Sequence, residues 1–217
     1  MVLTSKTAVT LLGASKAKTH DIDEALSRAP FLVAADGGAA TALAMGLTPQ
    51  AVIGDFDSLP KSVRDALPPD ILFPVAEQES TDFEKSLRMI DAPLILAVGF
   101  TGRRLDHELA VYNALARNPD KRIIIVGRQD IVFLAPTRLS LDLPEDSRLS
   151  LFPMGAVTGT SAGLAWPIDG LKFAPDGRIG TSNRVNGPVE LEFDVPAMLA
   201  IMPRVALDEA TRALTSG

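Results

Sequence analysis

Residues 51–58 read AVIGDFDS, a short apolar run followed at once by two aspartates. Apolar runs of similar length recur at 8–12, 31–35, 71–75, 94–98 and 122–126. Segments with helical patterning lie between the runs, at 23–28, 39–45, 61–67, 82–90 and 106–117. Because strands and helices alternate, the chain up to about residue 128 is predicted to form an α/β fold with a mostly parallel sheet and flanking helices.

Two of the predicted helices have local support. Thr81 followed by Glu84 has the spacing of a capping box, and Phe83, Leu87 and Ile90 then fall on one helix face. A second apolar stripe is formed by Leu105, Leu109, Tyr112 and Ala116. Both patterns indicate helices that pack through one face.

After about residue 127 the helical patterning largely disappears. Short apolar or alternating runs stand at 131–134, 139–143, 148–152, 189–195 and 199–202. Turn formers separate them, with PEDS at 144–147, APDG at 174–177 and NGP at 186–188. This texture is typical of an antiparallel sheet or sandwich, so a domain boundary is placed near 127–136. The tail after Asp208 is read as a short helix or a disordered end.

The composition excludes several kinds of chemistry. The 217 residues carry a net charge of −6, which argues against nucleic acid as the main partner. Cysteine is absent, so disulfides, thiolate nucleophiles and cysteine metal sites are excluded, and two histidines are too few for a histidine-rich metal site. The N-terminus lacks the features of a signal peptide and no stretch is apolar enough to span a membrane, so a soluble cytoplasmic protein is expected.

The usual nucleotide-binding fingerprints are missing, since neither GxxxxGK[ST] nor GxGxxG occurs. One GxSxG match stands at 159–163, but no histidine follows it in the chain and no helical pattern comes after it. We therefore interpret this match as a turn rather than as the site of a nucleophilic serine.

Aspartates follow the predicted strands again and again. Asp36 follows the run 31–35, Asp55 and Asp57 follow 51–54, and the segments after 71–75 and 94–98 lead to Asp82 and Asp106. Ligands of an open parallel sheet bind outside the carboxyl ends of its strands. The sequence therefore predicts that these carboxylates meet at one edge of the sheet.

Each member of this cluster also has a structural interpretation. In an extended segment the side chains of Asp55 and Asp57 would point the same way, with Cα atoms roughly 6–7 Å apart, which suits Mg²⁺ bound together with phosphate oxygens. The pair is also typical of an Asx turn. The glycines after Asp36 leave backbone N–H groups free for a phosphate or ribose, or simply form a tight turn. Asp82 can be a favourable charge at a helix start.

The loop 102–107, GRRLDH, brings two arginines, a carboxylate and a histidine together. Arginine forks match phosphate oxygens. Asp106 can cap the next helix, bind a metal or position a hydroxyl group, whereas His107 at a helix start is more often structural than catalytic.

Taken together, DGGA at 36–39, GDFDS at 54–58, STDFEK at 80–85 and GRRLDH at 102–107 resemble the thiamine pyrophosphokinase family in order and spacing. GLAWPI at 163–168 followed by GTSN at 180–183 is similar to that family's second half. The resemblance extends from about residue 8 to residue 203. GDFDS with a TDxxK segment some 25 residues later is specific, whereas the glycine motifs alone are not.

The resemblance implies an enzyme that transfers the diphosphoryl group of ATP to the hydroxyethyl oxygen of thiamine, with Mg²⁺, to give thiamine diphosphate and AMP. It implies a Rossmann-like nucleotide-binding catalytic domain at 1–130 and a β-sandwich domain at 131–217 for thiamine binding and dimerisation. It further implies a homodimer with active sites between the subunits.

Site residues are carried over by motif. The resemblance implies catalytic roles for Asp57, Arg104 and Asp106, and metal binding by Asp55, Asp57 and Asp82. For the nucleotide it implies Asp36, Gly37, Gly38, Gln78, Thr81 and Arg104. For thiamine it implies Trp166, Ser182 and Asn183. An indole face is the best aromatic partner for the cationic thiazolium, although a lone tryptophan is more often a core residue.

Some residues depart from the family pattern. Arg103 stands where a second glycine is common, Glu77 and Glu79 stand where aspartates are common, and Arg184 follows the SN pair in place of an acidic residue. These departures concern substrate contacts more than the type of reaction. Two rival hypotheses stay open: a Mg²⁺-dependent nucleotidyl or glycosyl transferase with another acceptor, and a nucleotide or thiamine sensor without turnover.

Overall fold

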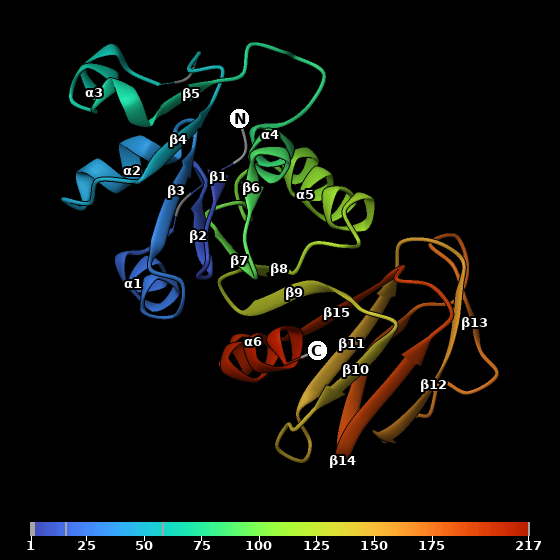
Figure 1. Cartoon of the computed structure of the whole chain (residues 1–217). Helices are drawn as coiled ribbons and strands as arrows, with labels where there is room; N and C mark the ends of the chain where they lie inside the picture. Colours follow the sequence, from blue (N-terminus) through green and yellow to red (C-terminus); the bar gives the residue numbers. More distant parts are fainter. Residues whose placement is uncertain (1–2, 16, 58, 217) are drawn as a thin grey trace. The chain divides into compact units, whose positions relative to one another are not determined.

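The computed structural model describes residues 3–15, 17–57 and 59–216, so Ser58 of the GDFDS motif lies outside the described residues. The chain divides into two compact units, and Figure 1 shows their elements. One unit comprises residues 1–114 with 125–127, and the other comprises residues 115–124 with 128–217.

The first unit is built on the predicted parallel sheet. Its strands run in the order β8-β7-β2-β3-β4-β5. They are β2 (Val9–Leu12), β3 (Phe31–Ala35), β4 (Ala51–Gly54), β5 (Leu72–Pro74), β7 (Ile95–Val98) and β8 (Ile123–Val126), the last of which continues into the second unit. Neighbours from β7 to β5 pair in parallel. A small parallel pair is formed by β1 (Leu3–Thr4) and β6 (Ile90–Asp91). The predicted strands of this region are confirmed.

Helices follow these strands as the sequence predicts (Figure 1). They are α1 (Thr19–Arg28), α2 (Gly38–Ala44), α3 (Lys61–Asp65), α4 (Asp82–Met89) and α5 (Leu105–Arg117), with a 3₁₀ turn, η1, at Pro69–Ile71. The capping box is present, because Glu84 N–H donates to Thr81 Oγ1 and Thr81 N–H donates to Glu84 Oε2. Within the described ranges, no helix combines the length and the apolar character that a membrane span requires.

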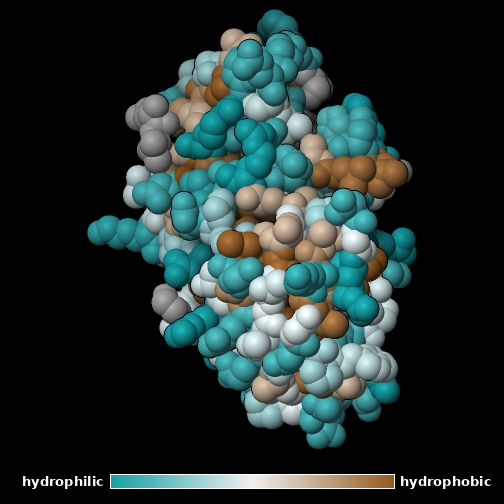
Figure 2. Space-filling view, turned by 90° about the vertical axis from the view of Figure 1, so that its right-hand side faces the viewer, coloured by the Kyte–Doolittle hydropathy of each residue, from teal (hydrophilic) through white to brown (hydrophobic). Residues whose placement is uncertain are grey.

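The apolar stripe predicted on α5 is real but faces the other way. Leu105 is 73% exposed and Leu109 is 58% exposed, whereas Val111, Ala114 and Leu115 are buried. The helical spacing correctly identifies one face, but spacing alone does not tell which of two apolar faces packs inward. Figure 2 shows small groups of apolar side chains among the hydrophilic ones on one side of the molecule.

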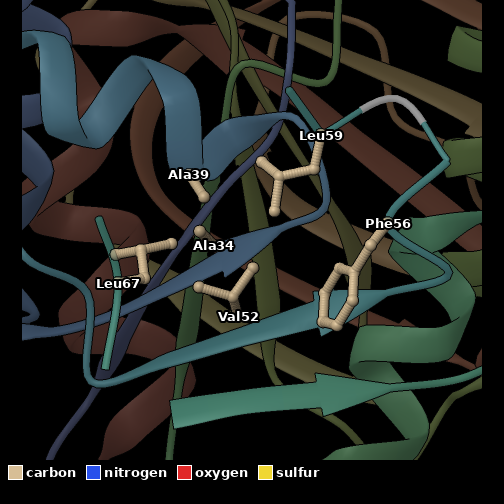
Figure 3. Packing of buried hydrophobic residues seen from close by; sticks show 6 residues of the cluster. All are labelled: Ala34, Ala39, Val52, Phe56, Leu59 and Leu67. Carbon is tan, nitrogen blue, oxygen red and sulfur yellow. The ribbon is translucent and has the colours of Figure 1, made fainter. Parts of the chain in front are cut away.

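Strands β2, β4 and β7 of the first unit are buried along their whole length, as is typical of a parallel sheet covered by helices. One core cluster lies beneath the segment that carries the paired aspartates (Figure 3). Its members come from β3, α2, β4 and the loops that follow, and they are Ala34, Ala39, Val52, Phe56, Leu59 and Leu67. The strand ends are therefore fixed on a closely packed base.

The second unit is antiparallel. Its strands are β9 (Asp130–Ala135), β10 (Arg138–Leu141), β11 (Arg148–Pro153), β12 (Val157–Leu164), β13 (Lys172–Phe173), β14 (Gly180–Phe193) and β15 (Met198–Pro203). The first part of β14 pairs with β11, and its second part pairs with β10 and β12. After β15 come a 3₁₀ turn, η2 (Arg204–Ala206), and α6 (Leu207–Thr215), so the tail is a helix.

Two predicted turns of this region are wrong. NGP at 186–188 lies inside β14, where the pairing with β12 shifts register, so its glycine and proline make an irregularity in a strand rather than an end of one. GxSxG at 159–163 lies inside β12. A Cβ on Gly159 would stand 2.2 Å from Glu192 O, and one on Gly163 would stand 2.1 Å from Pro188 O. These glycines allow β12 and β14 to approach closely.

Candidate active site

A cleft of about 430 Å³ lies at the carboxyl edge of the parallel sheet in the first unit. Every strand from β2 to β5, and β7, contributes the residues that follow it. The lining residues are Gly13, Ala14, Ser15, Ala35, Asp36, Asp55, Asp57, Gln78, Thr81, Asp82, Phe83, Gly99, Phe100, Arg103, Arg104, His107 and Val111. The predicted convergence of the strand-end aspartates is therefore observed for Asp36, Asp55, Asp57 and Asp82.

The cleft opens at the point where the order in which the chain adds strands to the sheet reverses. From β2 the strands proceed through β3, β4 and β5 on one side, and the chain then returns to β7 on the other side. Gly13 and Gly99 meet at this switch point, where a Cβ on Gly13 would stand 2.5 Å from Gly99 O. The two backbones approach so closely that neither position tolerates a side chain. Such a switch point is the usual ligand position in open α/β sheets.

Asp55 is the centre of a polar network in the cleft. Its Oδ2 accepts hydrogen bonds from Lys85 Nζ at 2.7 Å and from Gln78 Nε2 at 3.2 Å, and its Oδ1 accepts one from the Asp57 backbone at 3.1 Å. The hydrogen bond from Lys85, followed by that from the Asp57 N–H, lowers the pKa of Asp55. Asp55 is therefore held in its charged form.

Lys85 has no role in the prediction, yet it lies at the centre of the charges. Its side chain is only 2% exposed, and its Nζ lies 3.4 Å from Asp82 Oδ1 as well as against Asp55. Burial acts to lower the pKa of Lys85, but the bond to Asp55 and the charge of Asp82 outweigh it, so the pKa is raised. The signal in the sequence is the i,i+3 spacing of Asp82 and Lys85 on one helix face.

The expected geometry of the paired aspartates is wrong, because the segment is not extended. Phe56 adopts a left-handed conformation with φ 65°, and its ring is buried in the cluster of Figure 3. This bend lets the Asp57 N–H donate back to Asp55, as in an Asx turn. Both carboxylates still line the cleft, with Asp57 exposed to solvent.

The residues predicted to contact the nucleotide have different positions. Asp36, Gln78 and Thr81 line the cleft, whereas Gly37 and Gly38 are not among the residues that line it. Gly38 has a packing role instead, since a Cβ there would stand 2.1 Å from Leu12 O. Thr81 caps α4, and Asp36 is buried with φ 41°.

Asp82 shows that negative charge is concentrated in the cleft. Burial, followed by the charge of Asp36, raises the pKa of Asp82, and Lys85 opposes this shift only in part. A bound cation would relieve the same repulsion, and carboxylate oxygens are suitable ligands for a hard divalent ion. Among the described residues, however, no three acidic or histidine side chains stand close enough to hold a metal by themselves. The donor set thus fits a cation that shares its ligands with a phosphate group.

The loop before α5 supplies positive charge. Arg103, Arg104 and His107 line the cleft, and Arg104 makes a two-pronged ion pair with Asp106, at 3.1 and 2.6 Å. Asp106 itself is not among the lining residues. The hydrogen bond from Arg104 lowers the pKa of Asp106, so this carboxylate is a weak proton acceptor while the pair is intact.

A separate pocket of about 240 Å³ lies in the second unit. Trp166 and Asn183 line it together with Pro167, Ile168, Leu171, Phe173, Arg178, Ile179, Gly180 and Thr181. Trp166 is 55% exposed, so it is not the core residue that the alternative hypothesis would have made it. A volume this small suits one ring of a ligand rather than a whole ligand.

Asn183 and Ser182 differ in what they do. The buried Asn183 side chain accepts a hydrogen bond from Trp166 N–H at 3.1 Å and donates one to Trp166 O at 2.6 Å, so it fixes the tryptophan's backbone. Ser182, with φ 63°, donates its backbone N–H to Ser150 Oγ and is not among the residues that line the pocket.

The fold and cleft define an α/β protein with a candidate ligand site at the carboxyl edge of a parallel sheet, lined by carboxylates and arginines. Comparisons with known proteins identify the family. A family model described as "Thiamin pyrophosphokinase, catalytic domain" matches residues 22–126, and one described as "Thiamin pyrophosphokinase, vitamin B1 binding domain" matches residues 137–198. The chain belongs to the thiamine pyrophosphokinase family.

Relatives and solved structures agree with this assignment. Thiamine pyrophosphokinase 3 of Oryza sativa subsp. japonica is 30% identical over 156 residues, which are 63% of this chain and 58% of the rice protein. The chain thus spans under two thirds of the length of the curated relatives it matches. Thiamin pyrophosphokinase from Candida albicans has the same fold, with a TM-score of 0.77 at 17% identity over 93% of each chain. Thiamin pyrophosphokinase from Geobacillus thermodenitrificans gives 0.72 at 25% identity, over 90% of this chain and 96% of the other.

Proposed function

We propose that this protein is a thiamine diphosphokinase, which transfers the diphosphoryl group of ATP to thiamine and releases AMP. The observation that carries the proposal is the cleft at the switch point, which four carboxylates and two arginines line and where a buried lysine pairs with two of the carboxylates. Phosphoryl transfer depends mostly on positioning the reactants and on neutralising charge, and these groups supply both. Family membership points to the same reaction.

The reaction follows from the chemistry of the groups. The hydroxyl oxygen of thiamine forms a bond to the β-phosphorus of ATP, the bond from that phosphorus to the oxygen of the α-phosphate breaks, and AMP leaves with the electron pair. Asp55, Asp57 and Asp82 would hold Mg²⁺, which when bound neutralises charge on the phosphate oxygens. Arg104 binds the transferred phosphates, and Asp106, released from its ion pair with Arg104, orients the hydroxyl group or accepts its proton. Asp36, Gln78 and Thr81 contact the nucleotide.

The two units would divide the work as the sequence predicts. We assign nucleotide binding to a Rossmann-like domain at 1–130 and thiamine binding to a β-sandwich domain at 131–217. Support comes from the parallel order of strands β7 to β5 and from the antiparallel pairing around β14. Trp166 offers a partly exposed indole for the cationic ring of thiamine. The protein would work in the cytoplasm.

The test of the reaction is to incubate the protein with ATP, Mg²⁺ and thiamine and to separate the products by chromatography. Thiamine diphosphate and AMP are expected in equal amounts, and a chelator should abolish both. Thiamine monophosphate with ADP would overturn attack at the β-phosphorus. Absence of any product in spite of nucleotide binding would favour another acceptor or a sensor.

The proposed enzyme is a homodimer, and the exposed face of α5 supports this. Leu105 and Leu109 lie one turn apart on it, and exposed apolar side chains grouped on one helix often mark an interface. We expect sedimentation velocity to show a dimer that Leu109→Glu converts to a monomer. Val205→Glu is the control, because Val205 is 94% exposed but lies outside α5. A wild-type protein that stays monomeric at every concentration would refute the dimer.

A further inference from the structure

The exposed indole of Trp166 already carries a cation. The guanidinium carbon of Arg184 lies 5.4 Å from the centroid of the Trp166 ring. This distance is within the range of a cation–π contact, which extends to about 6 Å. One face of the indole is thus occupied by a side chain of the protein itself.

Hydrogen bonds hold the backbone around Arg184 and Trp166. Ala165 N–H donates to Arg184 O at 2.8 Å, and the Asn183 side chain accepts from Trp166 N–H and donates to Trp166 O. On its other side Arg184 Nη1 lies 3.3 Å from Asp146 Oδ1. Asp146 is anchored in turn, because its N–H donates to Val185 O at 2.9 Å. Arg184 is therefore held between a carboxylate and the indole.

We propose that Arg184 is a specificity-determining residue, which competes with cationic rings for the indole of Trp166. The proposal rests on the proposed function, in which the ring is the thiazolium of thiamine. A second cation that approaches this face must displace the guanidinium or lie beside it, and like charges at short range repel each other. An uncharged ring of the same shape meets no such repulsion. Arg184 thus weakens thiamine binding and lowers the preference of the pocket for charged rings.

The sequence provides a clean probe, because Trp166 is the only tryptophan of the chain. In the protein without ligand, quenching of its fluorescence by Cs⁺ and by neutral acrylamide should be compared in the wild type and in Arg184→Met. We expect Cs⁺ quenching to increase more than acrylamide quenching in the variant, because the competing cation is gone. An unchanged ratio of the two would show that Arg184 does not occupy the indole face and would overturn the proposal.

The second arm measures ligand affinity by the same fluorescence, without ATP. Arg184→Met is expected to bind thiamine roughly 2- to 30-fold more tightly, the range that one cation–π contact corresponds to. The affinity for the uncharged ring 5-(2-hydroxyethyl)-4-methylthiazole should change by less than about twofold. The matched control is Arg178→Met, which removes a positive charge from the lining of the pocket that Trp166 borders, whereas Arg184 contacts the Trp166 ring without being among the lining residues.

The outcomes separate this inference from the proposed function. If the wild type binds thiamine and Arg184→Met binds it equally or more weakly, the role of Arg184 is wrong and the function stands. Competition for the indole is also overturned if Arg184→Met raises the affinity for both rings equally. The same holds if Arg178→Met raises the affinity for thiamine as much as Arg184→Met does. If thiamine binds to neither protein, the thiamine assignment of the pocket fails together with the competition, and the product assay then decides whether the reaction survives.

Discussion

Replacing Asp57 with asparagine should lower turnover in the proposed diphosphoryl transfer at least about 100-fold, the scale of losing one group that stabilises charge in a transition state. The stability of the fold should change little. Asp57 is exposed, and asparagine retains the backbone N–H that donates to Asp55. The free energy of unfolding is therefore expected to change by less than about 0.5 kcal/mol.

The measurements for Asp57→Asn are turnover as a function of Mg²⁺ concentration and urea unfolding. A metal role predicts that half-maximal rate requires more Mg²⁺, which a mere loss of substrate contact would not produce. Asp70→Asn is the matched control, because Asp70 is an exposed aspartate of the same unit outside the cleft. Near-normal turnover of Asp57→Asn would mean that the metal assignment is wrong.

The first unit was predictable because its signals are local. Parallel strands covered by helices are apolar along their length, so runs such as 51–54 stand out in the sequence, and the carboxyl edge follows from the topology. The full length of strand β14 could not be predicted, because Gly187 and Pro188 are residues typical of turns in most contexts. Here they lie at a register shift within the strand, and only pairing partners far along the chain reveal that.

The site was predictable as a list of carboxylates but not as an arrangement. The conformation of Phe56 depends on a pocket built by β3, β4 and α2, so the bend between Asp55 and Asp57 is a tertiary effect. The burial of Lys85 could not be predicted, because lysines usually lie on the surface. Lys85 is buried because the ends of strands that are distant in sequence surround it. Likewise, no local pattern tells that Arg184 lies over Trp166.

Lys85→Met should destabilise the protein and abolish activity together. Lys85 is the buried cation between Asp55 and Asp82, and burial, followed by the charge of Asp36, raises the pKa of Asp82 even with Lys85 present. Removing a partner from a fully buried ion pair costs roughly 3–5 kcal/mol. Since Asp82 is 39% exposed, we expect a smaller loss, about 2 kcal/mol, in urea unfolding at neutral pH. Lys61→Met, which breaks the exposed pair with Asp65, should cost less than about 0.5 kcal/mol.

The pH dependence distinguishes charge from packing at Lys85. In the wild type the pKa of Asp55 is lowered, so its stabilisation is present above the ordinary aspartate pKa and is lost as the pH falls through the lowered value. Without Lys85 the carboxylates repel and their pKa values rise, so the variant regains stability as they become protonated. The difference between Lys85→Met and the wild type should therefore shrink from pH 7 toward pH 4, and Asp55→Asn should rescue part of it at neutral pH. A difference that stays constant with pH would mean that Lys85 contributes through packing of its aliphatic chain, and that the carboxylates tolerate one another without a buried cation.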